Sequence, residues 1–464
     1  MTLITSISGI RGTIGGRRDE GLSPNAIVEF TAAYATFLKM EDKTPKVIVG
    51  RDARVSGDMV NRIVSGTLMA MGINVVDLGL STTPTVELSV ASEKAGGGII
   101  ITASHNPAQW NALKLLNEQG EFISGQEGEK VLKIAKEHLY KFEKNDKLGS
   151  YSTDDTYLDK HIDKILALEL VDKAVVKKAG FSVVIDCVNS SGSLVLPKLL
   201  QELGVETIHE LHCTPDGRFP HNPEPLPENL SSLSNEVKFH KADLGISVDP
   251  DVDRLALVSE DGSFFGEEYT LVAVADYVLK NTPGSTVSNL SSTRALKDIT
   301  EKHGSRHFAS AVGEVNVVKM MKEQNAVIGG EGNGGIIFPE LHYGRDALVG
   351  VALFLTYLAK TGTKCSQLRN SYPDYFISKN KVQLVEGADT QGILKQMQEK
   401  YQHLPTNELD GVKIDFDNDW VHLRRSNTEP IIRIYAESES QNTAENLAKK
   451  MIEDIRALLQ ENNS

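Results

Sequence analysis

The chain has 464 residues, of which 40% are hydrophobic and 24% charged, and this composition is typical of a soluble globular protein. Its formal net charge of −14 excludes a general nucleic-acid binder, because a phosphate backbone requires a basic surface. The three cysteines, Cys187, Cys213 and Cys365, are too few and too far apart for a disulfide framework or a zinc site, and they fit a reducing compartment. Neither a long apolar run nor a secretory signal is present, so we expect no membrane contact and a cytoplasmic location.

The first three-quarters of the chain repeat one pattern three times. Its copies begin at KVIVGRDARVSG from Lys46, at SVVIDCVNSSG from Ser182 and at STVSNLSSTRAL from Ser285. A helical stretch, a glycine and a second strand with a polar end follow each of them. The pattern predicts three related α/β domains with largely parallel sheets, whose loops could face one cleft, although a chance resemblance among α/β units stays open.

The pattern changes near residues 370–373, after which strand-like segments and separate helices indicate a smaller α+β domain. A length of 464 residues also favours several domains over a single core. The predicted domains are residues 1–150, 151–256, 257–370 and 371–464.

The segment from Gly96 to Leu116 contains a short apolar run, Ile99–Ile101, that predicts a buried strand ending in a polar turn with Ser104. The carboxyl end of such a strand is where open α/β sheets bind ligands. Backbone N–H groups of the turn would favour the negative charge of a phosphate on Ser104. The alternative is that Ser104 is only a helix N-cap before Asn106 and Pro107.

Asp249, Asp251 and Asp253 alternate along SVDPDVDRLALV, so in an extended backbone their side chains would point the same way. Three such carboxylates would repel one another without a cation, and oxygen ligands alone indicate Mg²⁺ or Ca²⁺. An EF-hand is disfavoured because Arg254 replaces the required glycine, and a solvated acidic turn stays open. Arg254 could also balance part of the negative charge.

The glycine-rich segment GGEGNGG, residues 329–335, has the spacing of a dinucleotide-binding loop. The apolar residues 336–338 and a proline follow it where that loop requires a helix, so the context disfavours a dinucleotide. We instead expect a tight loop that presents Glu331 and Asn333 to the hydroxyl groups of a ligand, with a purely structural turn as the alternative.

The segment RRSNTEPIIRIYAE, from Arg424 to Glu437, combines guanidinium, hydroxyl and amide groups suited to a phosphate. An ordinary hairpin with solvated arginines is the alternative. Near the amino terminus, Arg11 lies between two glycines, which allow close approach of the backbone to a ligand.

Four of these motifs, TASHNP, DPDVDR, GEGNGG and RSNTEP, in this order and spacing resemble the α-D-phosphohexomutase superfamily from end to end. That superfamily includes phosphomannomutase/phosphoglucomutase and phosphoglucosamine mutase. The resemblance implies three related α/β domains with mixed, largely parallel sheets plus a C-terminal α+β domain around a central cleft.

The resemblance also implies roles for single residues. Ser104 would be the phosphorylated serine, and together with Asp249, Asp251 and Asp253 it would hold one Mg²⁺. Arg11 and Arg254 would steady the transferring phosphoryl group, and acid–base catalysis would fall to Lys114 or, as second choice, His105. Substrate contacts would come from Glu331, Asn333, Arg425, Ser426, Asn427, Thr428 and Arg433.

The implied reaction interconverts a hexose 6-phosphate and its 1-phosphate through a bisphosphorylated sugar, which also serves as activator. Many members have G-E-x-S-G-H in the sugar loop, whereas this chain has Asn333 and Gly335, a form that looks like phosphoglucosamine mutase. Phosphomannomutase/phosphoglucomutase is the alternative, and a metal-dependent sugar phosphatase or a non-enzymatic sensor are remote ones. We expect small sugar phosphates as the partners and a monomer or homodimer.

Overall fold

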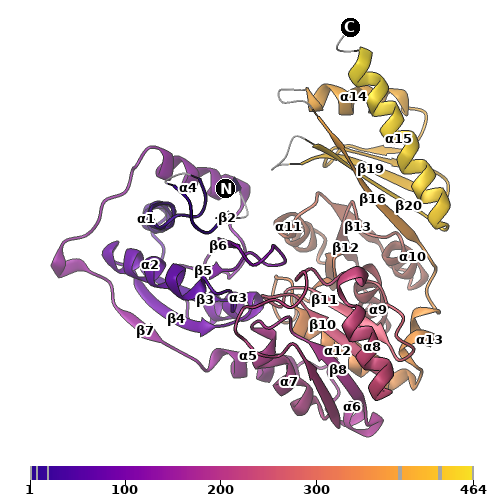
Figure 1. The fold of residues 1–464 in the computed structure, drawn as a ribbon, viewed down its shortest axis with the longest axis horizontal. Coiled ribbons are helices and arrows are strands. Elements are labelled where there is room, and N and C mark those ends of the chain that lie inside the picture. Colours follow the sequence, from indigo (N-terminus) through magenta and orange to yellow (C-terminus); the bar gives the residue numbers. More distant parts are fainter. Residues whose placement is uncertain (1–2, 7–8, 18–19, 385–388, 427–430, 462–464) are drawn as a thin grey trace.

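The computed structural model describes residues 3–6, 9–17, 20–384, 389–426 and 431–461. Within them the chain forms four sheets with helices packed around them (Figure 1). Among these residues no helix is both long and apolar enough to cross a bilayer.

The first domain contains a seven-stranded sheet in the order β1-β2-β6-β5-β3-β4-β7. Its strands are β1 (Leu3–Ser6), β2 (Gly9–Thr13), β3 (Lys46–Arg51), β4 (Asn74–Leu80), β5 (Gly97–Ile101), β6 (Trp110–Leu116) and β7 (Tyr151–Thr153). Its helices are α1 (Pro24–Met40), α2 (Gly57–Ala70), α3 (Thr83–Ser92) and α4 (Gly125–Lys136).

The second and third domains each contain a four-stranded sheet, in the orders β11-β10-β8-β9 and β13-β12-β14-β15. The second consists of α5 (Tyr157–Leu166), α6 (Lys173–Ala179), β8 (Ser182–Asp186), α7 (Gly192–Leu203), β9 (Thr207–Leu211), α8 (Ser231–His240), β10 (Leu244–Val248) and β11 (Leu255–Ser259). The third consists of α9 (Glu267–Asn281), β12 (Thr286–Asn289), α10 (Ala295–Lys302), β13 (His307–Ser310), α11 (Glu314–Gln324), β14 (Ile328–Glu331), β15 (Gly335–Ile337), α12 (Ala347–Thr361) and α13 (Cys365–Arg369).

The threefold recurrence is confirmed by strand order and direction. In each domain the first strand of the repeat (β3, β8 or β12) lies parallel to both neighbours. The strand that carries the chemical motif (β5, β10 or β14) then turns back into an antiparallel partner, β6, β11 or β15. All three motifs therefore lie at the turn of a hairpin, at the carboxyl end of the equivalent strand.

The fourth domain has a five-stranded sheet, entirely antiparallel, in the order β16-β20-β19-β18-β17. Its elements are β16 (Phe376–Gln383), α14 (Thr390–Lys400), β17 (Thr406–Asn407), β18 (Val412–Asp415), β19 (Trp420–Arg425), β20 (Ile431–Ser438) and α15 (Gln441–Glu461). This is the predicted α+β domain. Figure 1 shows it against the third domain, which it contacts through a hydrogen bond from the Arg294 backbone to Glu437 and another between Ser291 and His422.

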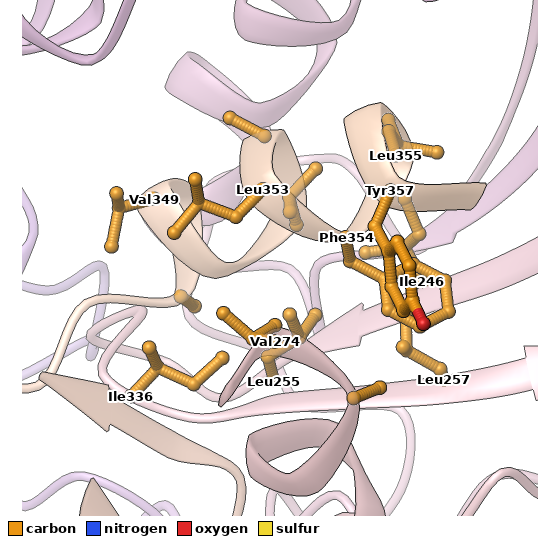
Figure 2. Packing of buried hydrophobic residues seen from close by; sticks show 14 of the residues in the cluster. Ile246, Leu255, Leu257, Val274, Ile336, Val349, Leu353, Phe354, Leu355 and Tyr357 are labelled. Atoms are coloured by element: carbon orange, nitrogen blue, oxygen red, sulfur yellow. The ribbon is translucent and has the colours of Figure 1, made fainter. Parts of the chain in front are cut away.

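The second and third domains share one hydrophobic core, whereas the first and fourth have cores of their own. Helix α12 is apolar along nearly its whole length and packs between the two sheets, with Leu353 and Phe354 near Ile246 of β10, Val274 of α9 and Ile336 of β15 (Figure 2). Because this core is continuous, it holds the aspartate hairpin and the glycine-rich hairpin in a fixed relation.

The domain boundaries stay a prediction, and two strands near them pair with the sheet of the preceding domain. Strand β11 spans the predicted boundary at residue 256 because it pairs with β10 of the second sheet. Strand β7 follows residue 150 but pairs with β4 and so extends the first sheet.

A large-to-small substitution tests the shared core. Leu353 is fully buried, so we expect Leu353→Ala to lower the free energy of unfolding by about 2–5 kcal/mol through lost burial and a residual cavity. Urea unfolding followed by circular dichroism measures it. Leu194 of α7 is 39% exposed, and Leu194→Ala should change stability by less than about 0.5 kcal/mol. Equal effects of the two substitutions would contradict the assigned core.

Candidate active site

A buried ion pair shapes the loop that carries Ser104. Asp52 and Arg54 follow β3, both side chains are fully buried, and Arg54 Nε lies 3.0 Å from Asp52 Oδ2. The rest of the Arg54 guanidinium donates to four backbone carbonyls of the β5–β6 loop, those of Ser104, Asn106, Pro107 and Trp110. One arginine therefore satisfies acceptors that would otherwise be buried without partners.

The backbone of Ser104 is in the left-handed region, with φ of 47°. A non-glycine residue there costs about 1–3 kcal/mol unless the surroundings enforce the conformation. Arg54 does so through the Ser104 carbonyl, and Thr102 Oγ1 does so by accepting from the Ser104 N–H while it donates to Asp52. The side chain of Ser104 is thereby directed toward the second domain.

The structure places Ser104 directly beside the aspartates. Ser104 Oγ donates to Asp249 Oδ2 at 2.7 Å, across the boundary between the first and second domains. Ligand oxygens of Asp249, Asp251 and Asp253 all lie within 4.8 Å of one another, and all three residues are fully buried. Two motifs separated by 145 residues in sequence thus form one site.

The backbone conformation predicted for the three aspartates is wrong, because they are not in an extended segment. They lie in the turn between β10 and β11, where Val252 has φ of 63°. Asp249 Oδ1 accepts from the N–H groups of Asp253 and Arg254 and so closes the turn. The side chains meet because the chain folds around Asp249, not because they alternate along a strand.

The carboxylate cluster fits a hard divalent cation. Asp251 Oδ1 and Asp253 Oδ1 are buried, and neither has a hydrogen-bond partner within the described part of the chain. Burial and repulsion from Asp253 and Asp251 raise the pKa of Asp249 well above its ordinary value. Unpartnered carboxylate oxygens with no nitrogen or sulfur donor among them suit Mg²⁺.

Lys114, on β6, is one of the cations in contact with this cluster. Its Nζ lies 2.7 Å from Asp251 Oδ2 and 3.4 Å from Asp253 Oδ2. Burial alone would lower the pKa of Lys114, but the two carboxylates outweigh burial and raise it. Lys114 also holds the pKa of Asp251 below its ordinary value against the opposing effect of burial. Thr83, at the start of α3, donates a further hydrogen bond to Asp251 Oδ2 at 2.6 Å.

The other predicted catalytic residues surround Ser104. His105 Nδ1 lies 3.4 Å from Ser104 Oγ, and burial with the charges of Arg254 and Arg11 lowers the pKa of His105 well below its ordinary value. Arg11 donates to Asn106 Oδ1 at 3.3 Å, and Arg254 Nη1 lies 3.2 Å from Glu224. Burial and the proximity of Arg254 lower the pKa of Arg11, so the two guanidinium groups share one region beside the serine.

The glycine-rich hairpin between β14 and β15 lies next to the aspartate hairpin, and Arg345 contacts both. Strand β15 follows directly, which agrees with the rejection of a dinucleotide loop. Glu331 Oε1 accepts from Asn289 Nδ2 and from the Gly313 N–H, and its Oε2 accepts from Arg345. Asn333 Oδ1 accepts from the N–H of Gly335 and thereby stabilises the turn.

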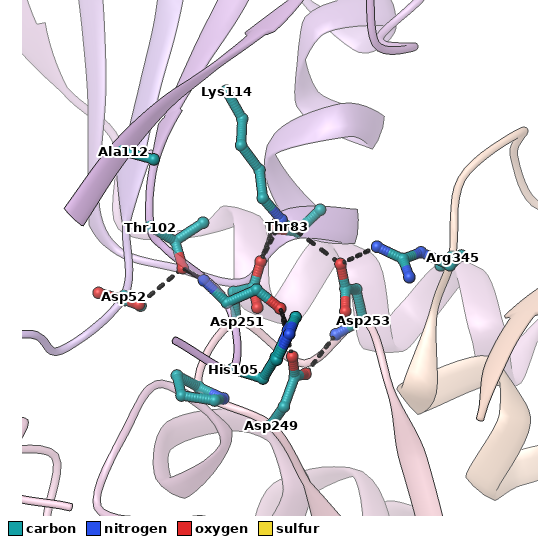
Figure 3. A network of polar contacts seen from close by, with 12 residues as sticks. Asp52, Thr83, Thr102, His105, Ala112, Lys114, Asp249, Asp251, Asp253 and Arg345 are labelled. Carbon is teal, nitrogen blue, oxygen red and sulfur yellow. Dashed lines mark hydrogen bonds and ion pairs between the residues drawn. The ribbon is translucent and has the colours of Figure 1, made fainter. Parts of the chain in front are cut away.

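The sequence predictions missed Arg345, which connects the aspartate hairpin to the glycine-rich hairpin. Its guanidinium donates to Asp253, to Glu331 and to Glu314 of α11 (Figure 3 shows the first contact). Those three carboxylates raise the pKa of Arg345 despite its burial. Arg54 and Thr83 were missed as well. Their roles could not be read from the sequence, because each binds groups from another part of the chain.

The predicted phosphate site lies at the β19–β20 hairpin of the fourth domain. Arg425 ends β19, Arg433 lies on β20, and Ser426 follows β19 and donates its N–H to the Ile431 carbonyl. Asn427 and Thr428 lie outside the described residues. Among the hydrogen bonds and ion pairs of the residues described, none joins Arg425 or Arg433 to Ser104 or to the aspartates.

Removing the Arg54 guanidinium tests its role in shaping the serine loop. Arg54→Met leaves Asp52 and four carbonyls without their donor, so we expect a loss of about 3–5 kcal/mol in the free energy of unfolding. Hydrogen exchange of residues 102–110 should also rise. Arg62→Met removes an exposed arginine of α2 whose side chain is 78% accessible, and should leave both quantities unchanged. Unaltered hydrogen exchange in Arg54→Met would contradict the proposed role of Arg54 in fixing the loop that carries Ser104.

Four domain models match this chain in order. They are described as phosphoglucomutase/phosphomannomutase alpha/beta/alpha domains I, II and III, over residues 3–141, 159–262 and 266–375, and the C-terminal domain of the same family, over residues 381–454.

Full-length relatives agree with the domain models. The chain is 36% identical over 440 residues to a phosphoglucomutase/phosphomannomutase of Thermococcus kodakarensis, covering 93% of this chain and 95% of that protein. It is 33% identical to a probable phosphoglucosamine mutase of Methanopyrus kandleri, covering 98% of each. A phosphoglucomutase/phosphomannomutase family structure from Burkholderia thailandensis superimposes with a TM-score of 0.85 at 25% identity, covering 98% and 97% of the two chains. This chain therefore belongs to the phosphoglucomutase/phosphomannomutase family, within the α-D-phosphohexomutase superfamily that its four motifs resemble.

Proposed function

We propose that the protein is a phosphohexomutase that interconverts hexose 6-phosphate and hexose 1-phosphate, with glucosamine phosphate as the favoured substrate. The observation that carries this proposal is the 2.7 Å contact between Ser104 Oγ and Asp249, because a serine hydroxyl at a buried cluster of metal-ligand type supports a nucleophilic role for Ser104. A hydroxyl so placed is suited to accept and return a phosphoryl group.

In the proposed mechanism Ser104 carries the phosphoryl group and donates it to the free hydroxyl of the sugar. Asp249, Asp251, Asp253 and the phosphorylated Ser104 would hold Mg²⁺, which when bound supplies positive charge against the phosphoryl oxygens. Arg11 and Arg254 lie beside the serine, where they would contribute further positive charge. The bisphosphorylated sugar then reverses its orientation, and its other phosphate returns to Ser104.

Two side chains are placed to handle protons during this transfer. Lys114 lies 2.7 Å from Asp251 Oδ2, and the pKa of Lys114 is raised by Asp251 and Asp253 although burial opposes this. His105 Nδ1 lies 3.4 Å from Ser104 Oγ, within reach of the proton of the serine hydroxyl. We propose that Lys114 assists acid–base catalysis, with His105 as the alternative.

The sugar and its second phosphate require contacts away from the serine. We propose that Glu331 and Asn333 contact sugar hydroxyls from the β14–β15 turn. We also propose that the fourth domain binds the phosphate that is not reacting, and that it closes over the cleft. The phosphate contacts would come from Arg425, Ser426, Asn427, Thr428 and Arg433.

The preferred sugar is a finer question than the reaction. The Asn333 and Gly335 form of the sugar loop supports glucosamine phosphate, as does the similarity to the Methanopyrus kandleri protein. The Thermococcus kodakarensis relative supports the alternative, a phosphomannomutase/phosphoglucomutase. We further propose a cytoplasmic location, which suits the three unpaired cysteines, and either a monomer or a homodimer.

A coupled assay tests the function and the substrate together. The 6-phosphates of glucosamine, mannose, glucose and N-acetylglucosamine are compared with Mg²⁺ and glucose 1,6-bisphosphate present. We expect 1-phosphate formation with the highest kcat/KM for glucosamine 6-phosphate. Release of free phosphate without 1-phosphate would instead indicate a phosphatase, and binding without turnover a sensor.

Ser104→Ala tests the covalent step. Without the hydroxyl no phosphoryl group can be stored, so turnover should fall by at least about 10³-fold, or roughly 4 kcal/mol in the barrier. Sugar-phosphate affinity, measured by calorimetry, should stay within a few-fold. Ser92→Ala, in α3 of the same domain, serves as the control and should keep full activity. Undiminished turnover in Ser104→Ala would contradict the proposal that Ser104 carries the phosphoryl group.

Arg433→Ala tests the phosphate grip of the fourth domain. Loss of a charge-assisted hydrogen bond of about 1.5–3 kcal/mol should raise KM by roughly 10–100-fold. Bisphosphorylated sugar should also escape into solution, where trapping by a second enzyme detects it. Arg456→Ala, an exposed position of α15, should change neither quantity. If Arg433→Ala retains the intermediate, residues other than Arg433 bind the phosphate that is not reacting.

A further inference from the structure

A second cluster of ligand-type side chains lies where the first three domains meet. It consists of His161 on α5, His342 in the segment before α12, and Asp346 at the N-cap of α12. The ligand atoms of these three residues lie within 4.8 Å of one another. His161 and Asp346 are fully buried, and His342 is 11% accessible. The mutase mechanism uses none of them.

Both imidazole rings face the same carboxylate oxygen. His161 Nε2 lies 2.9 Å and His342 Nε2 lies 3.3 Å from Asp346 Oδ2, and the two rings are nearly perpendicular at 86°. Asp346 Oδ1 accepts from the N–H groups of Leu348 and Val349, which fixes the orientation of the carboxylate. Three donor atoms are therefore held in place before any ligand arrives.

The outer nitrogen of each ring has its own partner from α3. His161 Nδ1 is hydrogen-bonded to Thr85 Oγ1 at 2.9 Å, and His342 Nδ1 lies 3.4 Å from Glu87 Oε2. An outer-nitrogen partner that accepts from Nδ1, as the Glu87 carboxylate and the Thr85 hydroxyl can, leaves the Nε2 lone pair free for a metal ion. In that tautomer two free lone pairs face a carboxylate oxygen, an arrangement that a cation would stabilise.

Glu87, the partner of His342 Nδ1, is a buried carboxyl group beside the cluster. It is 2% exposed, and within the described ranges neither of its carboxyl oxygens has a hydrogen-bond partner. Gly344 leaves the room that this carboxyl group occupies, since a Cβ there would lie 1.9 Å from Glu87 Oε2. Asp346 is a buried carboxylate beside the two rings, so a cation bound among the three side chains would meet a negative charge.

We propose that His161, His342 and Asp346 form a transition-metal site of the Zn²⁺ type, with Glu87 orienting His342. Imidazole nitrogens favour Zn²⁺ and similar ions, whereas the all-oxygen aspartate cluster favours Mg²⁺. In a tetrahedral zinc site with bonds of about 2.0–2.2 Å, neighbouring ligand atoms are roughly 3.3–3.5 Å apart. The separations of 2.9 and 3.3 Å need to open by only a few tenths of an ångström.

An ion there would have access and a structural effect. His342 and Glu87 line a cavity of about 750 Å³ that reaches the surface between the first and third domains. The site joins α5 to the segment of Arg345, the residue that contacts Asp253 and Glu331. Metal binding would therefore stabilise the contact of three domains and hold the Arg345 segment in place.

Zinc titration in excess Mg²⁺ tests the proposal on the full chain. After EDTA treatment and dialysis, calorimetry with ZnCl₂ should show one equivalent whose affinity falls at least about 100-fold in His342→Gln. In Glu87→Gln the affinity should fall by roughly 10–100-fold, as expected for a partner of a ligand. His303→Gln removes a histidine paired with Asp276 outside the cluster, and should bind zinc as the unaltered protein does. Bound Co²⁺ should give the visible absorption of a tetrahedral site in the unaltered protein.

Several outcomes would overturn the proposal. If zinc binds equally well to the unaltered protein and to folded His342→Gln, the cluster holds protons only. If His221→Gln abolishes binding instead, the site belongs to the separate group of Asp186, His212 and His221. Should His342→Gln fail to fold, the Co²⁺ spectrum of His221→Gln decides: retained bands support the proposal, and lost bands contradict it.

Discussion

The balance of charge around the three aspartates is the constraint on which the site depends. Asp249, Asp251 and Asp253 are buried together, and each has acquired donors from other domains: Ser104, Lys114 and Arg345. Burying carboxylates without partners would cost several kcal/mol each. The same contacts that stabilise the turn therefore bring the first and third domains to it, and assembly of the domains and assembly of the site are one process.

Two kinds of connection fix the positions of the active-site loops relative to one another. The aspartate and glycine-rich hairpins share the core around α12, so their relation is fixed by packing. The first domain is joined by polar contacts instead, including the Thr83 N–H to the Asp251 carbonyl and the Ala53 N–H to Ser190. The fourth domain contacts the third through hydrogen bonds such as Arg294 to Glu437. A rigid centre with two polar attachments allows the domain closure that the proposed reaction requires.

Much of this arrangement could be predicted from the sequence, because strand periodicity and the polar ends of strands are local signals. The three repeated α/β units with polar strand ends and the α+β character of the last domain followed from such signals, whereas the hairpin turns and the antiparallel order of the fourth sheet were not predicted. The left-handed conformation of Val252 did not, since valine seldom adopts it and nothing nearby in sequence demands it. The roles of Arg54 and Arg345 could not be predicted either, because the sequence does not distinguish an arginine that binds distant carbonyls or carboxylates from any other arginine.

The repeated hairpin explains how one backbone plan supplies three different functions. Each copy places a turn at the same edge of its sheet, so the plan decides only where a side chain lies. In the proposed mechanism, serine in the first copy, aspartates in the second and Glu331 with Asn333 in the third would decide the chemistry. The serine and the aspartates would then meet only the phosphoryl group, so choice among sugars would arise in the third copy and the fourth domain. The fold alone therefore cannot distinguish glucosamine from mannose phosphate, whereas contacts at the 2-position of the sugar can.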